Sequence, residues 1–67
     1  MGRNMWKFVR LEDNTYAVYY RGNRLADGIR AERREEEFCI RFGFCGQECQ
    51  EIIRQLDVSG ECTVVLD

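Results

Sequence analysis

The residues with the most obvious capacity for chemistry are four cysteines, Cys39, Cys45, Cys49 and Cys62. Four thiolates can hold a zinc ion, but structural zinc sites use pairs of ligands a few residues apart. Cys45 and Cys49 form one such pair, whereas Cys39 and Cys62 do not form a second. Because unpaired cysteine often packs as a small buried hydrophobe, we expect reduced, structural thiols and no metal or cofactor. A disulfide or a redox-active thiol is the alternative, with Cys39 and Cys45 as the most exposed candidates.

Catalytic chemistry has little support in this sequence. The chain contains no histidine, which removes the commonest general base and the usual nucleophilic triads. The segment Gly43-Phe44-Cys45-Gly46 lacks the Lys and Ser/Thr that follow in a phosphate-binding loop. We therefore expect that the protein is not an enzyme.

Size and composition predict one small globular domain. The chain has 67 residues, of which 33% are charged and 45% are hydrophobic. A domain of this size buries only about 60% of its unfolded surface, so its stability is marginal unless a disulfide, a metal or a partner adds to it. No apolar run is long enough to span a bilayer, and no signal peptide is recognisable, which predicts a cytoplasmic protein without membrane contact. Residues 1–4 are expected to be frayed.

Charge is distributed unevenly along the chain. Residues 1–34 contain eight Lys and Arg against four acidic residues, a net charge of +4. Residues 35–67 contain two arginines against eight acidic residues, a net charge of −6. Such asymmetry indicates an anionic partner for the first half, unless both signs simply lie on a solvated surface.

The first half has the pattern of a three-stranded β-meander. Segments 5–11 and 15–21 are rich in aromatic and β-branched residues and flank the turn Glu12-Asp13-Asn14. Gly22-Asn23 is a plausible second turn, followed by a third strand over 24–30. Tight turns would pair Leu11 with Tyr16 and Tyr16 with Ile29.

This pairing divides the meander into two faces. The expected core face is the one with aliphatic residues, namely Met5, Val9, Leu11, Tyr16, Val18, Tyr20, Leu25 and Ile29. The opposite face contains aromatic residues, small residues and arginines, and burial of that face instead is the competing choice. A slip of one residue in the register would exchange the faces.

The second half predicts a strand, a helix and a final strand. Residues 31–37 are expected to form a solvated turn, with a single helical turn as the alternative. Phe38, Ile40, Phe42 and Phe44 alternate as in a half-buried strand over 38–44. A helix is predicted over 47–57 with Gly46 as its N-cap, because Cys45, Cys49, Ile52, Ile53 and Leu56 have helical spacing.

Ser59-Gly60 ends this helix, and residues 62–66 form the last strand, which could pair with either the strand at 38–44 or the first strand. The predicted fold class is therefore α+β, a small antiparallel meander of three or four strands followed by one amphipathic helix and a final strand. The helix packs on one face of the sheet.

A single helix is too narrow to cover both faces of such a sheet. The predicted binding face combines exposed aromatic residues with arginines, namely Trp6, Phe8, Arg10, Tyr19, Arg21, Arg24 and Arg30. Aromatic residues and arginine are enriched at protein interfaces, which predicts a noncatalytic protein-interaction module, either an adaptor or inhibitor of a larger protein or a self-associating chain. Binding of single-stranded nucleic acid through the same face is the alternative, although the acidic net charge disfavours it. A structural zinc domain is a minor alternative, and a sheet that curls to bury these aromatics would remove the binding face altogether.

Overall fold

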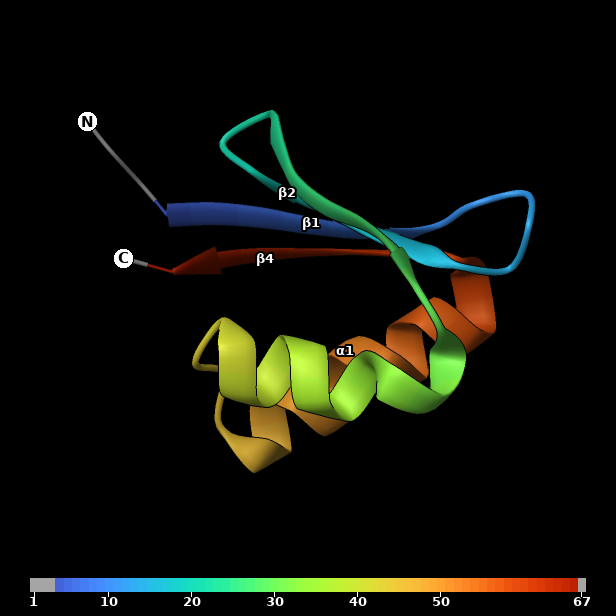
Figure 1. The fold of residues 1–67 in the computed structure, drawn as a ribbon. Helices are drawn as coiled ribbons and strands as arrows, with labels where there is room; N and C mark the ends of the chain where they lie inside the picture. Colours follow the sequence, from blue (N-terminus) through green and yellow to red (C-terminus); the bar gives the residue numbers. More distant parts are fainter. Residues whose placement is uncertain (1–3, 67) are drawn as a thin grey trace.

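Four antiparallel strands and a set of helical segments on one side of them make up the computed structural model, which describes residues 4–66 (Figure 1). The strands are β1 (Asn4–Arg10), β2 (Tyr16–Tyr20), β3 (Asn23–Ile29) and β4 (Glu61–Leu66), in the sheet order β3-β2-β1-β4. The predicted α+β class, with a meander followed by a helix and a final strand, is confirmed. Asn4 belongs to β1 and is not frayed, whereas residues 1–3 lie outside the described part.

The last strand completes the sheet beside the first. β4 pairs antiparallel with β1 along its whole length, with Phe8 opposite Cys62 and Trp6 opposite Val64. This is one of the two placements that the sequence left open. β1 therefore lies inside the sheet, with β2 on one side and β4 on the other.

The register between β1 and β2 differs by one residue from the prediction. Arg10, not Leu11, lies opposite Tyr16. The connection is longer than expected because the Leu11 N–H donates to the Thr15 carbonyl at 2.7 Å, and Asn14 adopts a positive φ of 67°. The Asp13 carboxylate accepts from both the N–H and the hydroxyl of Thr15. This turn moves the core face of β1 from Met5, Val9 and Leu11 to Trp6 and Phe8.

The pairing of β2 with β3 is partly as predicted. Tyr16 lies opposite Ile29, but Tyr20 lies opposite Asn23 and not Leu25. Arg21 and Gly22 occupy the turn, both with positive φ, as hairpin turns that follow the strand twist require. Two register shifts interrupt the ladder, between Tyr16 and Val18 and between Val18 and Tyr19, and make β3 an irregular edge.

The predicted strand over 38–44 is wrong, because the chain is helical up to Arg41 and irregular over residues 42–44. A short 3₁₀ helix, η1 (Ala31–Arg33), is followed by a π-helical segment, η2 (Glu36–Arg41). Alternation over seven residues does not separate the two structures, since Phe38 and Phe42 are also one helical turn apart. The sheet also has no place for this segment next to β1, because β4 occupies that position. The helical alternative for 31–37 is closer to the structure.

The predicted amphipathic helix is confirmed as α1 (Gly46–Ser59), slightly longer than expected. Cys45, not Gly46, is the N-cap, and its N–H donates to the Glu48 carboxylate at 3.2 Å. At the other end Gly60 takes the left-handed conformation, with φ of 81°, and its N–H donates to the Leu56 carbonyl at 2.9 Å. Glycine suits this position because a Cβ would be strained there.

The core lies between the sheet and the helical segments. It contains residues from every strand except β4, from η2, from the segment between η2 and α1, and from α1: Phe8, Tyr16, Val18, Ile29, Phe38, Phe44, Cys49, Ile52 and Leu56. Phe8 contacts Phe38 and Phe44, with ring centroids at 4.8 and 5.6 Å. Arg34 connects the layers, since it lies over the Tyr16 ring and pairs with Asp57 of α1 at 2.8 Å.

Candidate functional site

Two of the predicted binding residues lie inside the molecule. Phe8 is 0% exposed, and Trp6 is half-buried among Phe8, Tyr20, Phe42 and Phe44. Their assignment to an exposed face is wrong because the β1 register is shifted by one residue. Trp6 and Phe8 are therefore residues that stabilise the fold.

The predicted arginines do not gather on one face. Arg10 belongs to the inner-face series of β1, and its guanidinium lies next to Gly60, within 3.4 Å of the position that a Cβ would take there. Arg21 lies in the turn after β2, over the Tyr20 ring at 5.7 Å. Arg30 follows β3, where its carbonyl accepts from the Arg33 N–H. Only Tyr19 and Arg24 of the predicted set lie opposite each other on the uncovered side of the sheet.

The sheet face that the helical segments leave uncovered is here called the open face (Figure 1). Neighbouring side chains along a strand point to opposite sides of the sheet. Because Trp6, Phe8 and the residues opposite them point inward, the residues that alternate with these along each strand lie on the open face. These residues are Met5, Lys7, Val9, Ala17, Tyr19, Arg24, Glu61, Thr63 and Val65, of which Ala17 is fully buried. The open face is thus half apolar and carries charge of both signs.

Tyr19 and Arg24 form an ordered pair on the open face. The Arg24 guanidinium lies 5.2 Å from the centre of the Tyr19 ring and donates to the phenol oxygen at 2.6 and 3.1 Å. It also donates to the Asp27 carboxylate at 3.0 Å. The hydrogen bond to Tyr19, and next that to Asp27, raises the pKa of Arg24 above its ordinary value. A partner would meet a ring and a guanidinium that are already oriented, which lowers the entropic cost of binding.

Apolar side chains surround a shallow hollow beside this pair. Its volume is about 390 Å³, and it is lined by Met5, Lys7, Val9, Tyr19 and Gly22. Met5 and Val65 are 47% and 44% exposed. The sequence prediction missed these residues because it assigned Met5 and Val9 to the core; the signal that would have placed them is the length of the β1–β2 turn.

The cysteines do not follow the predicted pattern of four reduced thiols. Cys39 of η2 and Cys49 of α1 form a disulfide, while Cys45 is exposed and Cys62 is half-buried. Burial, and next the charge of Glu51, raises the pKa of the Cys62 thiol. Among residues 4–66 no three His, Cys, Asp or Glu side chains are grouped as metal ligands would be.

Comparisons with family models, curated proteins and solved structures found no match to this chain. Within the described residues, no helix is long and apolar enough to cross a membrane.

Proposed function

We propose that the protein is a noncatalytic interaction module that binds another protein through its open face. The observation that carries this proposal is an uncovered sheet face on which Met5, Tyr19 and Arg24 lie close to one another. Tyr, Arg and Met are enriched at the centres of protein interfaces. An adaptor or an inhibitor of a larger protein fits this arrangement, and pairing of two copies through the same face is its self-associating form.

The nucleic-acid alternative loses much of its support. It required several aromatic rings beside several free guanidinium groups, for base stacking and phosphate contact. Trp6 and Phe8 pack in the interior, and Arg24 is already bonded to Tyr19 and Asp27. We therefore do not propose nucleic acid as the ligand.

Affinity capture with matched variants tests this function. Met5→Lys and Tyr19→Ala alter the open face, whereas Val58→Lys alters an apolar residue of α1 that is 74% exposed. We expect the first two to weaken binding of the captured protein about 30-fold or more, the size of an interface hot spot. Val58→Lys should bind like the wild type, and melting curves should show all three folded. A partner retained equally by all variants would contradict the use of the open face.

The oligomeric form is tested on the purified chain. If two copies pair through the open face, sedimentation should show a dimer whose population rises with concentration and falls for Met5→Lys. A monomer at all concentrations leaves another protein as the partner.

We also propose a cytoplasmic location. Because the cytoplasm keeps most thiols reduced, this location requires the Cys39–Cys49 disulfide of the structure to be open in the cell, and rapid alkylation of intact cells should then trap both cysteines mainly as thiols. A fully oxidised pair in those cells would contradict this location.

A further inference from the structure

The two edges of the sheet differ in how well they are protected. β3 is interrupted by two register shifts, a common device that prevents pairing with another chain. β4 pairs with β1 without interruption from Val9–Glu61 to Asn4–Leu66. β4 also contains no proline, so its free edge remains competent for strand pairing.

The phase of the β1–β4 ladder shows which backbone groups face outward. The Arg10 N–H donates to the Gly60 carbonyl at 2.8 Å, so these two residues form a hydrogen-bonded pair. In an antiparallel ladder, residue pairs that exchange hydrogen bonds alternate with pairs that do not. The backbone groups of Cys62 and Val64 therefore face β1. Those of Glu61, Thr63 and Val65 face the free edge. All three N–H groups and the carbonyls of Thr63 and Val65 are available there, whereas the Glu61 carbonyl accepts from the Ser59 hydroxyl at 3.1 Å.

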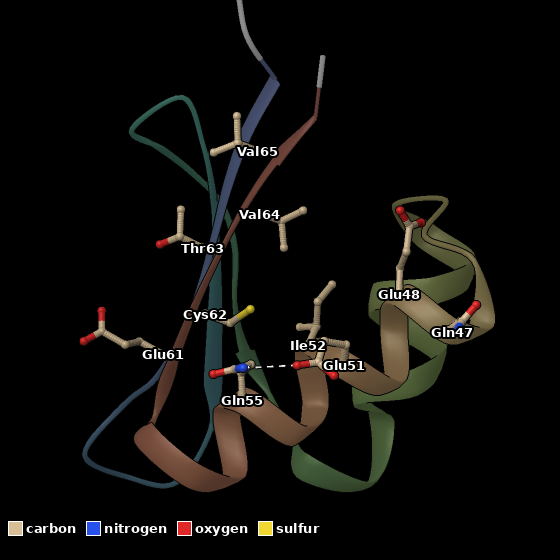
Figure 2. Close-up of a pocket in the computed structure, with 10 residues that line it drawn as sticks. All are labelled: Gln47, Glu48, Glu51, Ile52, Gln55, Glu61, Cys62, Thr63, Val64 and Val65. Carbon is tan, nitrogen blue, oxygen red and sulfur yellow. Dashed lines mark hydrogen bonds between the residues drawn. The ribbon is translucent and has the colours of Figure 1, made fainter.

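A groove runs along this edge, between β4 and α1 (Figure 2). Its volume is about 840 Å³, more than twice that of the hollow on the open face. Cys62 and Val64 point toward α1 and Ile52 points toward them, while Thr63 and Val65 point away (Figure 2). The groove thus has an apolar floor beside a row of unpaired backbone groups, as in proteins that accept an extended segment as an added strand.

The charged residues that line the groove are all acidic: Glu48, Glu51 and Glu61. Glu51 pairs with Arg54 on the same helix, and Glu61 lies 3.8 Å from Lys7. Glu48 accepts the Cys45 N–H but has no ion-pair partner in the described part of the chain. The Glu61 side chain points away from α1 (Figure 2), so the carboxylates of Glu48 and Glu51 are the ones that make the groove favourable for a cationic segment and unfavourable for an acidic one.

We propose that β4 accepts an extended, basic segment of another protein as a fifth strand, with its lysine or arginine side chains directed to Glu48 and Glu51. This site is separate from the open face and does not depend on it. Pairing with the β4 of a second copy is disfavoured, because it would bring two sets of the same carboxylates together.

Amide hydrogen exchange with a synthetic probe tests this proposal. The probe is an octapeptide of alternating lysine and valine; its controls are the glutamate–valine counterpart and a lysine–valine peptide N-methylated along one edge. We expect the first peptide to slow exchange at Glu61, Thr63 and Val65 about tenfold or more, with little change at Cys62 and Val64. Both control peptides should leave exchange unchanged.

Variants of the protein separate the backbone and charge contributions. Thr63→Pro removes one outward N–H and leaves the β1 ladder intact, so it should keep the fold and weaken peptide binding about tenfold. Glu48→Gln should weaken binding about two- to fivefold and reduce its salt dependence, whereas Glu12→Gln in the β1–β2 turn should not.

Three results would overturn the proposal. One is equal binding of the acidic and basic peptides, and another is binding without protection of the three outward amides. The third is protection that appears when the protein alone is concentrated, since a second copy would then occupy the edge.

Discussion

Phe8 is one of the side chains through which the sheet contacts the helical segments. It is fully buried and contacts Phe38 of η2 and Phe44, which lies between η2 and α1. Met5, three residues earlier on β1, lies on the open face and is 47% exposed. One strand therefore supplies a core residue on one side and an exposed residue of the proposed binding face on the other.

We expect Phe8→Ala to lower the free energy of unfolding by about 3–5 kcal/mol, because the surrounding core cannot fill the cavity. Met5→Ala should cost about 1 kcal/mol or less, as exposed substitutions usually do. Urea unfolding measures both values. Comparable losses for the two variants would contradict the assignment of the faces.

A second residue-scale prediction concerns the Cys62 thiol. Its pKa is raised by burial and by Glu51, so the folded protein holds this proton more tightly than the unfolded chain. The resulting stabilisation is fully present below the ordinary thiol pKa of 9.0 and is lost as the pH rises through the folded value.

The rate of Cys62 alkylation should therefore reach its midpoint at a higher pH in the native protein than in urea, as measured by peptide mass spectrometry. Glu51→Gln should shift the native midpoint partly back. The same midpoint in native and denatured protein would contradict the raised pKa.

At the scale of elements, the disulfide joins the least regular segment to the most regular one. Cys39 of η2 is bonded to Cys49 of α1, ten residues later. Since residues 31–45 contain no strand that could pair with the sheet, this bond holds η2 against α1. Phe38, next to Cys39, is thereby positioned against Phe8.

Reduction should lower the free energy of unfolding by about 2–3 kcal/mol, because a loop of this length gains conformational freedom in the unfolded chain. Urea unfolding with and without reductant measures the difference. Cys39→Ser should be insensitive to reductant, while Cys62→Ser should respond like the wild type. Identical wild-type curves in both conditions would show that the bond does not stabilise the fold.

The order and type of most elements follow from residue patterns, but their registers do not. The apolar stripe of α1, the aromatic and β-branched residues of β1 and β2, and the short run of residues after Ser59-Gly60 in β4 were sufficient to predict these elements, whereas the period-2 pattern over 38–44 predicted a strand that is not there. The register of β1 depends on hydrogen bonds within one turn, where Asp13 and Asn14 add a residue to the connection.

The one additional residue in the β1–β2 connection places Trp6 on the inner face of the sheet. Most of the predicted site was therefore assigned to the wrong face. Tyr19 and Arg24 lie on the uncovered face, as predicted, because the inner face of β2 was predicted correctly, and their role in binding stays a prediction.

At the scale of the whole molecule, one side of the sheet is covered by the helical segments of the chain and the other is uncovered. The helical segments cover Phe8, Val18 and Ile29, and the open face carries Met5, Tyr19 and Arg24. A 67-residue chain buries only a small hydrophobic core, so a partner bound to the open face would also raise its free energy of unfolding.

Photo-crosslinking in the native cells tests the open face most directly. Tyr19 is replaced by the photoreactive residue p-benzoylphenylalanine, and Val58 on α1 is replaced in the matched control. Both positions tolerate a bulky ring, since Tyr19 is already aromatic and Val58 is 74% exposed. The open-face account predicts a discrete protein adduct from position 19 and none from position 58. Adducts of equal yield from both positions, or from position 58 alone, would contradict it.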